Sequence, residues 1–159
     1  MEILFRKAGE ADIAGIAHLW HAGWHDGHAA VVPDALVALR TPESFADRTR
    51  AHLAGMRVAL LGDQLAGFFL LKGNELNQFY VAADARGRGV AQAMMGEAMR
   101  VLRAAGVERA WLYCAPGNAR AERFYARCGW ENMGQETVGF ETSAGPFELP
   151  VIRFERALD

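Results

Sequence analysis

Lysine is scarce in this sequence: Lys7 and Lys72 are the only two among 159 residues. Arginine therefore carries almost all of the positive charge, and the formal net charge at pH 7 is only -2. A chain so close to neutral has no overall electrostatic attraction to nucleic acid or to an anionic membrane surface. We expect neither as a partner, so any positive charge that serves function must be local.

Cysteine and long apolar runs are scarce as well. Cys114 and Cys128, the two cysteines of the chain, form neither a metal-ligand spacing nor a disulfide framework. Both stand in apolar segments, which predicts buried free thiols in a reducing compartment. No apolar run approaches the roughly 20 residues that span a membrane, and charges interrupt the start MEILFRKAGEAD, unlike a secretory signal. The sequence therefore predicts a cytoplasmic protein.

The length suits one domain, residues 1–159, with an ordinary globular composition of 52% hydrophobic and 23% charged residues. Short apolar runs predict strands at 2–8, 56–62, 65–73, 75–83, 107–115, 130–141 and 147–158. Helical spacing predicts helices at 9–23, 41–55, 89–106 and 118–129, and a short one opened by Pro33. The central strand–helix–strand unit predicts parallel pairing, and the flanking hairpins predict antiparallel pairing. We therefore expect an α/β fold of mixed α+β type, with helices on both faces of the sheet.

The stretch VAADARGRGVAQAMM, residues 81–95, places two arginines and two glycines between an apolar run and an apolar helix. It lacks the third glycine of a dinucleotide fingerprint, because Gln92 stands there, and it lacks the Gly-Lys-Ser/Thr of a P-loop. Two interpretations remain from the residues alone: a glycine-rich turn with solvated arginines, or a site for a diphosphate. In the second, backbone N–H groups and the start of the next helix bind the anion, assisted by Arg86 and Arg88.

The segment RGRGVA, residues 86–91, resembles the R/Q-x-x-G-x-G/A signature of the GNAT superfamily, the acetyl-CoA-dependent N-acetyltransferases. Downstream, NARAERFYARCGW (118–130) resembles a second motif of that family, an asparagine followed by a helix with a Phe-Tyr pair and a Gly-aromatic end. The order of the predicted elements is similar to the family's over nearly the whole chain, most weakly in residues 20–55. The resemblance implies a mostly antiparallel sheet whose fourth and fifth strands, a central parallel pair, splay apart.

The resemblance also implies that acetyl-CoA is the acyl donor and that no metal is needed. By this analogy the backbone of Phe79, Tyr80 and Val81 meets the pantetheine arm, since an extended chain of amides can pair with open strand backbone. The residues whose backbone amides would hold the diphosphate are Arg86, Gly87, Arg88, Gly89, Val90 and Ala91. Asn118 either caps its helix or contacts the cofactor.

Two side chains are the candidates for moving protons during the reaction. The resemblance makes Tyr125 the general acid, placed against the cofactor so that its phenol protonates the departing sulfur. From its position on an apolar helical stripe alone, Tyr125 would instead be a core residue. Glu75 stands where several family members carry a glutamate, which makes it the candidate general base. The alternative for Glu75 is a solvated side chain at the start of a strand.

Four of the five histidines are concentrated in one short segment, at His18, His21, His25 and His28. Their spacing would place them on one face of a helix, and the most specific interpretation of such a cluster is a metal site. Gly23 and Gly27 are expected to break that helix, and no carboxylate cluster accompanies the histidines. We therefore predict no metal site.

In the resembled family this segment helps to frame the pocket for the acceptor amine. Trp24, His25 and His28 are accordingly predicted to contact the substrate. The loop TSAGP (142–146) is predicted to form the opposite wall. The few acidic residues in these walls argue against a polycationic acceptor.

Two functions of different classes remain open from the sequence. The first is an N-acetyltransferase that moves an acetyl group from acetyl-CoA to a primary amine of a small molecule or peptide, by direct transfer through a ternary complex. The second is a non-catalytic acyl-CoA-binding module. Binding of CoA is common to both, whereas release of its thiol in the presence of amines is not. Antiparallel edge strands near the C-terminus are compatible with a homodimer.

Overall fold

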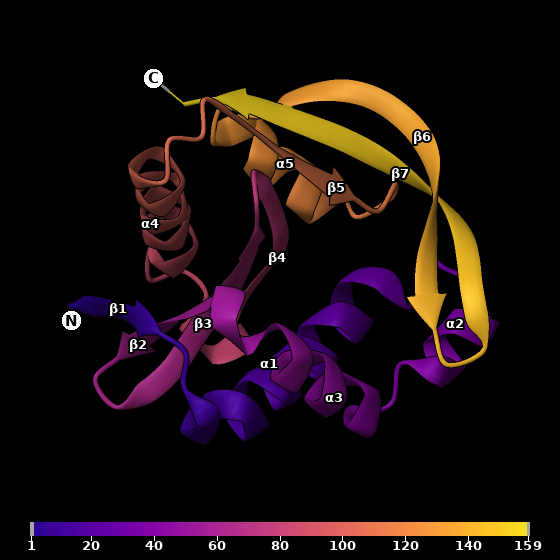
Figure 1. Ribbon diagram of the computed structural model, residues 1–159, viewed down its shortest axis with the longest axis horizontal. Coiled ribbons are helices and arrows are strands. Elements are labelled where there is room, and N and C mark those ends of the chain that lie inside the picture. The colour runs from indigo at the N-terminus through magenta and orange to yellow at the C-terminus, as the bar shows by residue number, and fades with distance from the viewer. Residues whose placement is uncertain (1, 159) are drawn as a thin grey trace.

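The computed structural model describes residues 2–158 and is organised around one seven-stranded sheet of order β1-β2-β3-β4-β5-β7-β6 (Figure 1). The strands are β1 (Ile3–Lys7), β2 (Met56–Leu61), β3 (Gln64–Lys72), β4 (Glu75–Val81), β5 (Arg109–Cys114), β6 (Glu131–Thr142) and β7 (Gly145–Ala157). The α-helices in this range are α1 (Ile13–His28), α2 (Asp34–Leu39), α3 (Pro42–His52), α4 (Val90–Ala104) and α5 (Ala119–Arg127). These bounds confirm the predicted elements, including the short helix after Pro33.

Helices cover both faces of the sheet, as predicted (Figure 1). On one face α1 and α3 bury Trp20 and Phe45 against Phe68 of β3. On the other face α4 and α5 pack over a second cluster that includes Met94 and Phe69. Phe68 and Phe69 are neighbours in the chain and enter opposite clusters because side chains alternate across a strand. The result is the mixed fold that the sequence predicts.

All pairings in the sheet are antiparallel except that of β4 with β5, which is parallel. In the described chain these two strands share a single register pair, Glu75 with Trp111, and then diverge. On the other side of β4 the register with β3 shifts between Leu70 and Leu71, which leaves Asn77 as an extra residue. Such a bulge bends its strand and increases its twist. The splayed central pair is thereby confirmed.

Helix α1 runs without interruption to His28, so the prediction that Gly23 and Gly27 break it is wrong. Both glycines lie where another element approaches closely. A Cβ atom at Gly23 would stand 2.5 Å from Cδ1 of Tyr80, and one at Gly27 would stand 3.0 Å from Nδ2 of Asn118. The helix keeps the glycines because a larger residue would push β4 and the start of α5 away, and packing outweighs the low helix propensity of glycine.

The predicted helix starts at Thr41 and Asn118 are confirmed by their side-chain caps. The Thr41 hydroxyl accepts a hydrogen bond from the backbone N–H of Ser44, and the side-chain oxygen of Asn118 accepts one from the backbone N–H of Ala121.

The prediction of two buried cysteines is half right. Cys114 is buried, whereas Cys128, directly after α5, is only partly buried.

The last two strands form a long hairpin that arches from β5 toward α2 (Figure 1). Side chains near its far end, Phe147 and Leu149, pack against the cluster beneath α1 and α3. The hairpin thus crosses the gap that the splayed strands leave open. No helix in residues 2–158 combines the length and the apolar character that crossing a membrane requires.

Candidate active site

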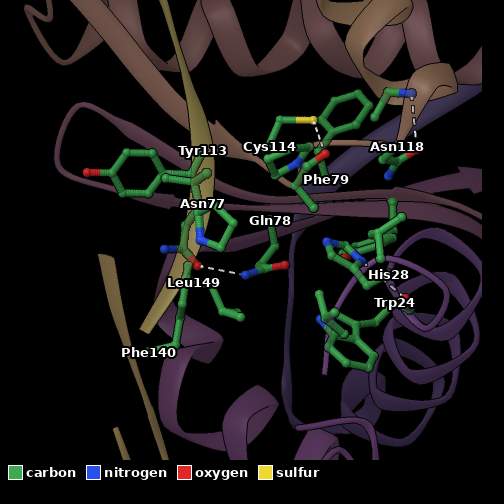
Figure 2. A pocket seen from close by; sticks show the side chains of 18 of the residues that line it. Trp24, His28, Asn77, Gln78, Phe79, Tyr113, Cys114, Asn118, Phe140 and Leu149 are labelled. Atoms are coloured by element: carbon green, nitrogen blue, oxygen red, sulfur yellow. Dashed lines mark hydrogen bonds between the residues drawn. The ribbon is translucent and has the colours of Figure 1, made fainter. Parts of the chain in front are cut away.

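A cavity of about 190 Å³ lies where β4 and β5 separate. Its floor is β4, and its walls come from α1, the α2–α3 region, the start of α5 and the β6–β7 hairpin. Figure 2 shows side chains from these distant segments converging on one space. The cavity therefore exists only because the central strands diverge and the hairpin closes over them.

The floor of the cavity carries the polar side chains of Asn77 and Gln78. The Gln78 amide donates a hydrogen bond to the Asn77 side-chain oxygen over 3.2 Å, and Figure 2 shows both side chains turned toward the cavity. Both stand at the bulge of β4, where a change of register re-aims side chains. Phe79 and Tyr80 line the same floor from opposite sides of the strand, whereas Val81 lies beyond the cavity.

Glu75 lines the cavity from the first residue of β4 and is half-buried. Burial raises the pKa of its carboxyl group, although Asn77 and the charges of Lys72 and Arg153 oppose the shift. A carboxylate with a raised pKa is a stronger base than an exposed one. The alternative of a fully solvated glutamate therefore describes this half-buried side chain poorly.

Tyr125 lines the cavity from α5, with its ring packed near those of Phe124, Trp130 and Phe154. Its hydroxyl has no hydrogen-bond partner among residues 2–158 and is not sealed in the core. Burial raises the pKa of the phenol, with a further contribution from Cys114. The group therefore stays protonated near neutral pH and keeps a free O–H to donate.

The structure brings Trp24 and His28 together on one wall and leaves His25 outside the cavity. The rings of Trp24 and His28 stack with centroids 5.2 Å apart and lie side by side in Figure 2. His25 instead has its Nε2 atom 3.0 Å from the carbonyl oxygen of Arg40. The geometry therefore does not support the prediction of His25 as a substrate contact.

The wall opposite α1 is built from strand residues of the hairpin and not from the TSAGP loop. Phe140, Leu149 and Val151 line the cavity, whereas residues 142–146 do not. The hairpin was predicted correctly, but the prediction that its turn lines the cavity was wrong. The two strands are long, so their middle residues lie over the gap between β4 and β5 and the turn lies beyond it.

The histidines of α1 pack with aromatic rings and with one another. His21 and His25 lie 4.4 Å apart by ring centroids, and His28 has its Nδ1 atom 3.1 Å from the Trp24 carbonyl oxygen. Within residues 2–158 no three or more His, Cys, Asp or Glu side chains form a group that could hold a metal ion.

The loop between β4 and α4 has the geometry of an anion site. Gly87 and Gly89 have φ angles of +78° and +79°, the left-handed region that side chains avoid. The backbone N–H groups of Gly87, Arg88 and Gly89 have no acceptor within residues 2–158. Helix α4 follows at Val90, and its first N–H groups are unpaired by the geometry of any helix. These unpaired donors lie within one short loop, which suits the binding of a phosphate oxygen.

Asp26 on α1 holds one arginine of this loop, a pairing that the sequence did not suggest. Its carboxylate accepts hydrogen bonds from Arg86 at 3.0 Å and from Arg120 of α5 at 2.8 Å. These two arginines, Arg120 first, hold the pKa of Asp26 below its usual range. Arg88 is thus the loop arginine without an ion-pair partner among residues 2–158.

Arg40 and Arg48 also line the cavity, and neither is among the site residues predicted from the sequence. A signal for Arg48 was present: it follows Phe45 by three residues on α3 and so shares the inward face of that helix. Arg40 carries no such pattern, since it stands in the connection between α2 and α3.

The sequence model of the Acetyltransferase (GNAT) family matches residues 13–130. An uncharacterized N-acetyltransferase of Mycobacterium tuberculosis H37Rv is 28% identical over 117 residues, which cover 68% of this chain and 75% of that protein. Two solved structures share the fold. A GCN5-related N-acetyltransferase from Rhodopseudomonas palustris has a TM-score of 0.78 at 21% identity, covering 99% of this chain and 97% of its own. YncA of Salmonella typhimurium, solved with its cofactor acetyl-CoA, has a TM-score of 0.71 at 17% identity, covering 100% and 95%.

The family match includes the strand, the loop and the two helices that build the cavity and the anion site. Both features thus lie within the matched residues 13–130, apart from the hairpin wall. The chain therefore belongs to the acetyltransferase (GNAT) family and is an acetyl-CoA-dependent acyltransferase.

Proposed function

We propose that the chain transfers an acetyl group from acetyl-CoA to a primary amine, directly and within a ternary complex. The observation that supports this most is that Glu75 and Tyr125 line one cavity at the opening between β4 and β5. A base and an acid in one cavity suit a reaction in which an amine loses a proton and a sulfur atom gains one.

Acetyl-CoA supplies a thioester, whose acetyl group passes to the amine while CoA leaves as a thiol. The donors of Gly87, Arg88 and Gly89, with those of Val90 and Ala91 at the start of α4, suit its diphosphate. The backbone of β4 from 79 to 81 has no register partner on β5, and it suits the amides of the pantetheine arm. Asn118 caps α5 through its oxygen, and its Nδ2 group remains available for a contact.

Glu75 is the proposed general base. Its raised pKa improves its capacity to take a proton from the amine, directly or through one water molecule. Tyr125 is the proposed general acid, because its raised pKa keeps the phenol protonated until a sulfur anion requires the proton. Trp24 and His28 form the wall against which the acceptor lies.

The experiment that tests this function measures thiol release from acetyl-CoA in the presence of a broad panel of amines. Because Cys128 is a partly exposed free thiol that can react with thiol reagents, blanks without amine and mass detection of the acetylated amine are required. Amine-dependent release with a matching acetylated product is the expected result. Tight binding of acetyl-CoA without release for any amine would contradict it and support the non-catalytic module.

A further inference from the structure

Two arginines of the cavity, one buried and one half-buried, have no counter-ion among residues 2–158. Arg40 is 8% exposed, and Arg48 is half-buried on α3. No carboxylate within residues 2–158 lies within ion-pair distance of either guanidinium group. The Nε atom of Arg40 and one Nη atom of Arg48 are buried without any hydrogen-bond partner.

Burying these two charges without a partner lowers the stability of the fold, so a purely structural role does not explain them. Buried charges are normally paired, because an unpaired charge loses its hydration without compensation. Here burial, with repulsion from Arg40, lowers the pKa of Arg48 to about 10. Arg48 does lie over the rings of Trp20 and Phe45, at 4.3 and 5.1 Å. A contact with a ring face supplies no hydrogen-bond acceptor in the plane of the guanidinium group, and one Nη atom of Arg48 is buried without any partner.

The arginines and the proposed base occupy different parts of the cavity. Arg40 directly follows α2 and Arg48 lies on α3, whereas Glu75 is the first residue of β4. No ion pair joins Glu75 to either arginine. Glu75 is also the only aspartate or glutamate among the described residues that line the cavity. The cavity therefore offers a cationic region and, apart from it, a site for an amine.

We propose that the acceptor is an amino-carboxylate compound, an amine whose own carboxylate group is bound by Arg40 and Arg48. A guanidinium group presents paired donors in one plane, which match the two oxygens of a carboxylate. Trp24, Leu36 and Leu149 supply an apolar surface for the rest of the molecule. The inference rests on the proposed function of this site and narrows its substrate class to amino acids and related compounds.

Binding of product-like probes tests the inference without any turnover. Protein saturated with CoA is titrated calorimetrically with N-acetylglycine, N-acetylleucine and N-acetylphenylalanine. Each is compared with its decarboxylated counterpart: N-methylacetamide, N-isopentylacetamide and N-phenethylacetamide. We expect at least one acid to bind roughly 10- to 100-fold more tightly than its neutral partner, the worth of charged hydrogen bonds. Equal binding within every pair would overturn the inference even if amines are acetylated.

Variants assign the preference to the arginines. Arg40→Met and Arg48→Met should each remove most of the difference in affinity between an acid and its neutral partner, while the affinity for CoA stays the same. Arg50→Met is the matched control, since Arg50 is an exposed arginine of the same helix, paired with Asp47. If loss of the Arg48 contact to Trp20 prevents folding of that variant, Arg40→Met decides alone. A carboxylate preference that survives Arg40→Met would overturn the assignment.

Discussion

Burial raises the pKa of both Tyr125 and Glu75, and the same shift suits them to opposite tasks. A phenol with a raised pKa stays protonated and can act as an acid. A carboxylate with a raised pKa holds a proton more strongly once it has taken one, so it acts as a better base. One apolar environment can therefore prepare both groups.

Tyr125→Phe should separate chemistry from binding. The phenylalanine ring fills the same space between Phe124 and Trp130, so folding and the affinity for acetyl-CoA should change little. Without the phenolic proton, kcat should fall by about 10²–10⁴-fold, the usual worth of general acid catalysis. Steady-state kinetics and calorimetry measure the two quantities.

Tyr113→Phe is the comparison for this variant. The Tyr113 hydroxyl already donates to Glu136 over 2.6 Å and is turned away from the other labelled side chains in Figure 2. Its loss should leave kcat nearly unchanged. A Tyr125→Phe enzyme with wild-type kcat, on an acceptor whose chemistry limits the rate, would show that Tyr125 only packs.

The pH dependence of the rate should report the ionisation of Glu75. A general base works only when deprotonated, so kcat/KM should fall as the pH drops through the pKa of Glu75. Because burial raises this pKa, the fall should begin at a higher pH than for an exposed glutamate, whose pKa is about 4.3. Glu75→Gln should abolish this limb and lower kcat/KM by about 10²-fold.

Glu97→Gln serves as the control for the pH profile. Glu97 lies on α4, where hydrogen bonds from Arg100 hold its pKa below the usual range. Its replacement should leave the acid limb in place. An acid limb that persists unchanged in Glu75→Gln would mean that another group is the base.

At the scale of elements, the proposed diphosphate site depends on the β4–α4 loop. Gly89 needs its positive φ angle to turn the loop into α4, and nothing lies within 4 Å of an added Cβ atom. Gly89→Ala should therefore cost roughly 1–2 kcal/mol of unfolding free energy through backbone conformation alone. Because the altered loop no longer aims its N–H groups together, the Kd for acetyl-CoA should rise at least tenfold, as measured by calorimetry.

Gly106→Ala is the control that separates the loss of stability from the loss of acetyl-CoA affinity. Gly106 ends the same helix with a φ angle of +83° and equally open surroundings, far along α4 from the loop. Its replacement should cost similar stability in urea unfolding without changing the Kd for acetyl-CoA. An equal loss of affinity in both variants would assign the effect to stability and not to the loop.

At the scale of the whole molecule, the sheet consists of two halves that meet in one place. Strands β1 to β4 join β5, β7 and β6 through the pair of Glu75 with Trp111 and through two hydrogen bonds that Trp111 donates to Asn74. A pantetheine arm between β4 and β5 would connect the halves beyond this point. Ligand binding should thus stabilise the sheet as a whole.

Acetyl-CoA at about 100 times its Kd should raise the free energy of unfolding by about 2.7 kcal/mol. Hydrogen exchange should slow in β4 from 77 to 81 and in β5, in addition to the loop at 86–91. Adenosine diphosphate, which lacks the pantetheine arm, should protect the loop but not the strands. Equal protection of β4 and β5 by both ligands would contradict the proposed path of the arm.

The sequence by itself determined the elements, their order and the glycine-rich loop between β4 and α4. Each of these depends on interactions within a few residues: apolar periodicity for β3 and α4, the caps at Thr41 and Asn118, and the left-handed glycines at 87 and 89. The resemblance to the family then placed Glu75 and Tyr125 where the cavity forms.

Only the tertiary structure decided which side chains share that cavity. Gly23 and Gly27 sit inside a continuous helix because β4 and Asn118 pack against them from distant parts of the chain. The pairing of Asp26 with Arg86 and the unpaired burial of Arg40 have the same origin. Local sequence patterns determine which helix or strand a segment forms. Whether a charged side chain has a partner depends instead on which elements the sheet brings together.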